Sequence, residues 1–228
     1  MSTSNVTAKP PAPAASNGKT PDPMAWLRAH PRVTFGVAGA VVLVVLGGWL
    51  TMEIGQRRQL RAAEALDRAR SVAESGNLPL AANQLQQLIE TFGGTEAASE
   101  AVVTLNQVRM VNGQSQLAVV GLQDYLKTDP KPVYKVPAQG LLGEALENSG
   151  RPAEAGAAYA GAARDAELDY LKAQYLLSAA RAYRNAGQVP EAVKALQEIV
   201  DKYGETTAVV EAKVRLSELT QGRMTLGS

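Results

Sequence analysis

The sequence predicts an all-α protein, with one N-terminal transmembrane helix, an α-solenoid of about four helix-turn-helix repeats and a C-terminal capping helix. Three observations predict this fold. Glycines recur at a 37-residue step, a 20-residue run near the N-terminus contains no charged residue, and a Pro- and Ala-rich stretch precedes that run. The 228 residues, 46% hydrophobic and 20% charged, leave room for one repeat domain with attachments.

The first predicted segment is a flexible tail over residues 1–23. It is rich in Pro, Ala, Ser and Thr and holds almost no large apolar side chain. Because such a stretch cannot bury enough apolar surface to offset the entropy of ordering, we expect it to be disordered.

Residues 24–56 are predicted to form a membrane-proximal segment and a transmembrane helix, with the span at about residues 33–54. The uncharged run from Val33 to Met52 is about 30 Å long as a helix, which matches the hydrocarbon core of a bilayer. A buried core helix and a cleaved signal peptide are the rival interpretations. We favour an uncleaved anchor, because nothing else in the chain is apolar enough to bury the run and its length exceeds that of a signal peptide.

The flanks of the run fit a membrane interface but leave the orientation open. Trp26 and Trp49 lie near its two ends, and arginines lie on both sides. An N-terminus in the cytoplasm with periplasmic repeats is allowed, since a long C-terminal domain can be exported largely regardless of its charge. Gly36 and Ala40 form a small-x-x-x-small pair that predicts a transmembrane packing face.

The repeats follow from a ladder of small residues. The 37-residue step relates Gly76, Gly113, Gly150 and Gly187, each of which we expect to end the first helix of a unit. The same step relates three further sets of positions: Ala81, Ala118, Ala155 and Ala192; Leu85, Leu122, Tyr159 and Leu196; Ala69, Asn106, Gly143 and Ala180. Small residues belong where two helices cross closely, and large ones fill the space beside them.

This ladder divides the rest of the chain. We expect repeat 1 at residues 57–95, repeat 2 at 96–132, repeat 3 at 133–169 and repeat 4 at 170–206, followed by a capping helix at 207–221 and a tail at 222–228. The capping helix would cover the otherwise exposed apolar face of the last repeat.

One stretch identifies the type of repeat. Leu142 and Gly143 followed by Leu146, Ala155 and Tyr159 resemble the tetratricopeptide repeat (TPR) pattern. The step is three residues longer than the usual 34, and we expect the surplus between the units, where turn residues gather.

The composition gives no support for catalysis. There is no cysteine and one histidine, His30, and no nucleophile, metal or dinucleotide motif is present. The net charge of +1 lacks the basic excess of a nucleic-acid-binding protein. We therefore expect no enzyme activity, no catalytic residue, no cofactor, no metal, no nucleic acid and no small-molecule substrate.

The remaining candidate is a partner-binding concave face made by the first helices of the units. The third unit would make this face acidic and the fourth would make it basic, with apolar patches at Val103, Met110 and Leu177, a mixture that suits a peptide or helix of another protein. The expected lining residues are Arg70, Val103, Gln107, Met110, Glu144, Glu147, Leu177, Arg181 and Arg184.

The layout also resembles a family of membrane-anchored bacterial proteins. The Ala-Trp-Leu-Arg-x-His-Pro-Arg sequence at residues 25–32, the apolar span and the sequence from Gly76 to Ile89 are similar to the TPR-like family that includes the ancillary subunit of the Sec translocon. This resemblance implies a single-pass inner-membrane protein with periplasmic repeats and translocon or chaperone partners.

Three functions remain open at this point. The first is a periplasmic scaffold that holds other proteins in secretion, folding or envelope assembly, anchored in the lipid bilayer through residues 33–54. The second is a structural accessory subunit of a large integral membrane complex, for example a bioenergetic or photosynthetic one. The third is a cytoplasmic-facing regulatory adaptor.

Overall fold

The computed structural model describes residues 31–220, apart from the side chains of residues 31–35 and 37–40. The predicted tails at residues 1–23 and 222–228, and the sequence Ala25 to His30, lie outside the described residues. The chain divides into two units, with the boundary between Ile54 and Gly55, and each is described by itself.

The described part of the first unit belongs to helix α2 (Pro31–Glu74). From Val41 to Leu46 every side chain is apolar and more than half exposed, and Trp49 and Leu50 are also exposed. A Cβ on Gly36 would meet no atom within 4 Å, and the side chain of Ala40 lies outside the described residues. Among the described residues, no helix combines the length and the apolarity that crossing a membrane requires.

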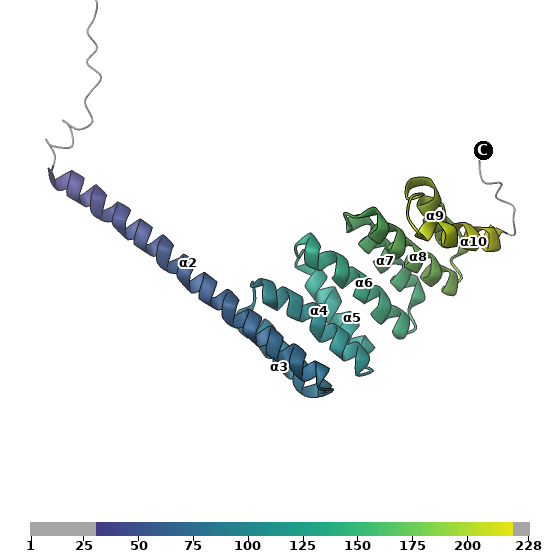
Figure 1. Ribbon diagram of the computed structural model, residues 1–228, viewed down its shortest axis with the longest axis horizontal. Coiled ribbons are helices and arrows are strands. Elements are labelled where there is room, and N and C mark those ends of the chain that lie inside the picture. The colour runs from purple at the N-terminus through teal and green to yellow at the C-terminus, as the bar shows by residue number, and fades with distance from the viewer. Residues whose placement is uncertain (1–30, 221–228) are drawn as a thin grey trace, which may run out of the picture. The chain divides into compact units, whose positions relative to one another are not determined.

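The second unit is a stack of helices that run back and forth along the chain (Figure 1). After the C-terminal part of α2 come α3 (Leu78–Phe92), α4 (Glu96–Val111), α5 (Ser115–Lys127), α6 (Pro132–Asn148), α7 (Pro152–Asp165), α8 (Asp169–Asn185), α9 (Val189–Lys202) and α10 (Ala208–Thr220). Within residues 55–220, no β-strand is present. The second unit is an all-helical, TPR-like solenoid.

The ladder of small residues behaves as predicted. All four glycines of the 37-residue step follow the first helix of a pair and have positive φ angles, between 72° and 85°. An L-amino acid with a side chain is strained in this left-handed conformation, which explains why glycine recurs there. The four related alanines, Ala81 among them, are fully buried.

Three clusters of buried side chains run along the stack. One joins α2, α3 and α4 around Leu85 and Leu105, the next joins α5 to α8 around Leu122 and Leu146, and the last joins α7 to α10 around Leu196. Consecutive helices pack against each other, and first helices of neighbouring pairs also touch, as α4 does with α6 and α8 with α10.

Two local findings refine the prediction. The connectors between helix pairs, where the three surplus residues are expected, are short, such as Gly93 to Thr95 between α3 and α4. Helix α10 buries Ala208, Ala212 and Leu216 against α8 and α9, which covers the apolar end of the last pair.

Candidate protein-binding face

We call the surface formed by the predicted lining residues of α2, α4, α6 and α8 the first-helix face. Of these side chains, Gln107, Glu144, Arg181 and Arg184 are exposed, and the others are half-buried. Val103 and Met110 pack against one core cluster and Leu177 against another. The apolar positions of the face therefore serve the core as well as the surface.

Two ion pairs on this face join neighbouring helix pairs. Arg70 on α2 donates to Glu100 Oε1 on α4 at 2.6 Å, and Arg181 on α8 donates to Glu147 Oε2 on α6 at 2.9 Å. The expected contrast between an acidic third unit and a basic fourth unit is therefore weakened, because Glu147 and Arg181 pair within the chain. The remaining charges, Glu144 and Arg184, are exposed.

Tyr159 fixes the Glu147 carboxylate from the core side. Its hydroxyl donates to Glu147 Oε2 at 2.9 Å, the same oxygen that Arg181 reaches. Burial and the neighbouring carboxylate raise the pKa of Tyr159 well above its usual range. The hydrogen bond from the guanidinium to Glu147 raises the pKa of Arg181. Tyr159, a core position of the repeat pattern, thus also contacts a residue of the first-helix face.

A hollow of about 250 Å³ lies on this face between α8 and α10. Its lining residues are Gln174, Leu177, Ser178, Arg181, Glu211 and Arg215. Leu177 and Arg181 are the predicted lining residues that the structure brings together here. The hollow combines one apolar side chain with hydrogen-bonding groups on both helices.

The sequence analysis missed the contribution of α10. Glu211 and Arg215 lie one 37-residue step after Gln174 and Ser178, so the ladder carried the signal that α10 presents the same face as α8. Arg215 Nε donates to Glu211 Oε1 at 2.7 Å, which pairs these charges along the helix. The capping helix therefore covers the core and extends the first-helix face.

Among the described residues, no group of three His, Cys, Asp or Glu side chains is arranged to hold a metal ion.

The comparisons with known proteins agree with this architecture. Residues 174–206 match the tetratricopeptide repeat model, which corresponds to most of α8, all of α9 and the connector that follows. No curated protein matches the sequence.

Solved structures share the fold. One is a protein from Podosopora anserina described as a kinesin light chain with nearly identical TPR-like repeats, with a TM-score of 0.56 and 20% sequence identity over 71% of this chain and 86% of that chain. A single-substitution variant of the same protein gives a TM-score of 0.55 at 20% identity, with the same coverage of both chains. At this identity the likeness concerns the fold.

Proposed function

We propose that the chain is a membrane-anchored TPR-like scaffold whose repeats hold other proteins on the periplasmic side of a bacterial inner membrane, in secretion, folding or envelope assembly. The first-helix face is the observation that supports the protein-binding part of this proposal. There a hollow with Leu177 at its wall and polar groups of α8 and α10 around it offers the mixture of contacts that recognises a peptide or a helix. The TPR-like fold supports the same class of partner.

The anchor is supported by the exposed apolar side chains from Val41 to Leu50 and by the uncharged run of the sequence that contains them. A helix that is apolar all round needs burial in a lipid bilayer or among other apolar helices. The periplasmic side rests on the resemblance to the Sec-associated family.

Protease treatment of spheroplasts tests the location. A protease added from outside should cut the repeats, as it cuts a known periplasmic domain in the same sample. If the repeats survive while that control domain is cut, the periplasmic location is wrong and the cytoplasmic adaptor takes its place.

Photo-crosslinking tests the binding face. A photoreactive residue at Gln107 or Gln174, both exposed on first helices, should give cross-links to an identified partner protein in cells. The matched control is Gln87, which is exposed on the second helix α3. Equal cross-linking from all three positions, or none from the first-helix positions, would contradict the proposed face.

Gentle detergent extraction separates a scaffold from an accessory subunit. A scaffold for passing clients should be recovered mostly alone. A constant stoichiometry with one membrane complex would favour the structural-subunit function instead.

A further inference from the structure

A half-buried arginine lies between the second helices α3 and α5. Arg109 belongs to α4, and its Nη2 donates to Gln86 Oε1 on α3 at 3.4 Å. A Cβ on Gly121 of α5 would lie 2.9 Å from Arg109 Nη1. The equivalent residues of the other units are apolar or aromatic: Val72, Leu146 and Tyr183. The second unit therefore has a cation where the other units have an apolar or aromatic side chain.

The Arg109 guanidinium has no carboxylate beside it. Its acceptors are two neutral amides, Gln86 and Asn106, whose Oδ1 lies 3.1 Å from Nη1. Among the side chains of residues 41–220, no carboxylate oxygen lies within 4 Å of it. Glu90, which is exposed on α3, is linked to it through Gln86, whose Nε2 donates to Glu90 Oε1 at 2.9 Å.

Burial makes this missing counter-ion costly. Removal of a cation from water is unfavourable unless an anion pairs with it, and burial lowers the pKa of Arg109. The guanidinium has more N–H groups than its two amide acceptors use. A carboxylate from outside the chain would supply the partner that the described residues do not.

A hollow of about 440 Å³ lies further along the same two helices, toward their carboxyl ends. Its lining includes Ile89, three residues after Gln86 on α3, and Tyr125, four residues after Gly121 on α5. Since a helix rises 1.5 Å per residue, the hollow and the Arg109 guanidinium are about 5 to 6 Å apart along the helices.

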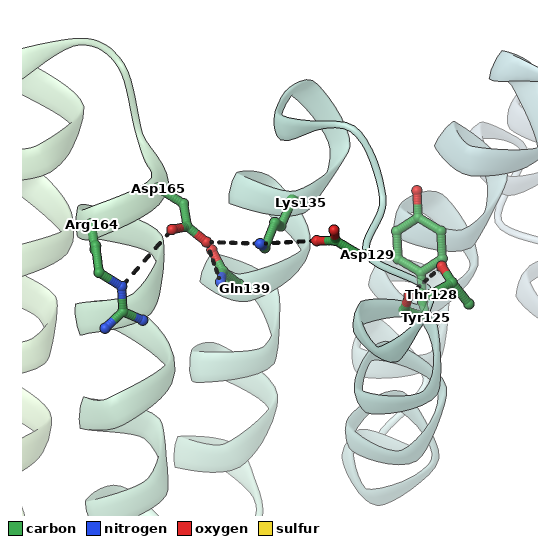
Figure 2. A network of polar contacts seen from close by, with 7 residues as sticks. All are labelled: Tyr125, Thr128, Asp129, Lys135, Gln139, Arg164 and Asp165. Carbon is green, nitrogen blue, oxygen red and sulfur yellow. Dashed lines mark hydrogen bonds and ion pairs between the residues drawn. The ribbon is translucent and has the colours of Figure 1, made fainter.

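The hollow is neutral and mainly apolar. Its two charged residues, Glu96 and Lys131, pair with each other at 3.2 Å. The hydroxyl of Thr128 donates to the main-chain oxygen of Tyr125 at 2.7 Å (Figure 2). The apolar and aromatic lining residues are Ile89, Ala98, Val102, Tyr125, Pro130 and Tyr134.

A comparison of equivalent positions explains the apolar lining. Ala98 and Val102 stand one 37-residue step before Lys135 and Gln139. Figure 2 shows these two later residues in a polar network around Asp165. Lys135 Nζ lies 3.4 Å from Asp165 Oδ2, and Gln139 donates to the same oxygen at 3.0 Å. At the positions of Ala98 and Val102 no such polar side chains are present.

Exposed apolar side chains also lie on the other side of Arg109. Leu117 is one helical turn before Gly121 on α5 and is 54% exposed. The residues in its position in the next two units are glutamates, Glu154 and Glu191. The guanidinium thus lies between an exposed leucine and an apolar hollow.

We infer that the surface between α3 and α5 binds an extended segment of a partner protein that carries a carboxylate and, two residues away, an apolar side chain. The carboxylate pairs with Arg109, and the apolar side chain enters the hollow. Alternate residues of an extended chain point to the same side and are about 7 Å apart, which matches the separation of the two sites.

Charge complementarity selects this occupant, because the surface presents a cation without a carboxylate partner beside a hollow without net charge. The inference rests on the proposed protein-binding function but uses a surface of the second helices, separate from the first-helix face.

Peptide selection on the full chain in detergent tests the inference. The probe is a phage-displayed library of short random peptides, followed by fluorescence anisotropy of a selected peptide and two altered copies. Selected peptides should carry Asp or Glu two residues from an apolar residue. A change of the acid to its amide should weaken binding at least about tenfold, because an ion pair is lost. A shift of the apolar residue by one position should have a similar effect, because its side chain then points away from the hollow.

Two variants of the chain test the role of Arg109. Arg109→Gln removes the charge and should weaken the selected peptide at least about tenfold. Gln86→Glu supplies a carboxylate at the position that already accepts from Arg109, so it should compete with the peptide and weaken it by a similar factor.

The matched control is Gln87→Glu, which makes the same charge change at the next, exposed position of α3. It should leave the affinity within about threefold, since an exposed charge without a direct contact contributes little. Melting curves show whether each variant is folded.

The outcomes separate the two proposals. The inference is overturned by a library that yields no binder, by selected peptides without the carboxylate and its spacing, or by binding that neither Arg109→Gln nor Gln86→Glu weakens. If Arg184→Gln abolishes binding while Arg109→Gln does not, the first-helix face binds proteins and the α3–α5 surface does not. Selected peptides that match a segment of this chain would replace the separate partner with a second copy.

Discussion

The second helix pair (α4 and α5) and the third (α6 and α7) share one register but cross with different side chains. In the second pair the crossing residue is Asn106, which is buried, and Gly121 on the facing helix makes room for it: a Cβ on Gly121 would lie 2.8 Å from Asn106 Oδ1. In the third pair the crossing residue is Gly143, and the Tyr159 ring fills the space, so that a Cβ on Gly143 would lie 2.6 Å from it.

At both crossings, therefore, the side chains of the two helices compensate for each other's size, and no particular residue is required. Asn106 and Gly143 are equivalent positions of the 37-residue repeat, although asparagine is polar and medium-sized and glycine has no side chain. In each pair, a glycine on one helix leaves room for a larger side chain on the other helix. Protein interiors are close-packed, so a change on one helix must be matched on its partner.

The largest expected effect comes from breaking the third crossing. Gly143→Leu pushes a side chain into the Tyr159 ring and should lower the free energy of unfolding by about 1–3 kcal/mol, since overpacking forces backbone or rotamer shifts. For a chain of this size that corresponds to a fall in melting temperature of roughly 2–4 °C per kcal/mol. An unchanged melting curve of the full chain would contradict the assigned register.

A compensating pair sharpens the same test. Gly143→Ala with Tyr159→Leu converts the third crossing into that of the fourth pair, where Ala180 and Leu196 stand in these positions. The two changes should couple favourably, so that the double variant is more stable than the sum of the single effects predicts, by about 0.5–3 kcal/mol. Additive effects in the thermal unfolding of all four chains would show that the two positions do not share one volume.

The turns should respond alike although the crossings differ. Gly113 and Gly150 end the first helices of the two pairs with φ angles of 74° and 72°. Gly113→Ala and Gly150→Ala should each cost about 1–2 kcal/mol, because an L-residue is strained in the left-handed region. The same change at Gly161, inside α7 and with ordinary contact distances around a Cβ, should be neutral or stabilising. Unequal losses of stability at the two turns would show that Gly113 and Gly150 are not equivalent positions of the repeat.

The two helix pairs also show how much of the structure can be predicted from the sequence alone. The step of 37 residues predicts the turns, the buried alanines and the all-helical stack, because those positions depend on local backbone conformation and on residue size. It does not reveal that Gly121 compensates for Asn106 or that Glu147 is neutralised by Arg181. Such contacts depend on which side chains of different helices meet, and the periodicity of the sequence does not predict those pairs. The network around Asp165 was missed for the same reason.

Tyr159 links the stability of the third pair to pH, because burial and the Glu147 carboxylate raise its pKa. The folded chain holds the Tyr159 proton more tightly than the unfolded chain, whose tyrosines ionise near pH 10, so its contribution to stability is full below about pH 10 and is lost as the pH rises above it. Tyr159→Phe should remove the hydrogen bond to Glu147, lower the stability at pH 7 by about 1 kcal/mol and make the alkaline loss less steep. Urea unfolding at several pH values measures both. If the stability of the variant falls with rising alkaline pH as steeply as that of the unchanged chain, Tyr159 is not the cause of the alkaline loss.

The smallest expected effects concern the two ion pairs on the first-helix face. The side chains of Arg70 and Glu100 are 38% and 48% accessible, whereas that of Glu147 is only 19% accessible and also accepts a hydrogen bond from Tyr159. Because solvent screens an exposed pair, Arg70→Met should change stability by only about 0.2–1 kcal/mol. Arg181→Met should have the larger effect of the two, since it leaves a half-buried carboxylate with one neutral donor. Unfolding curves at low and high salt measure the difference, and a greater loss for Arg70→Met would show that burial does not set the strength of these joints.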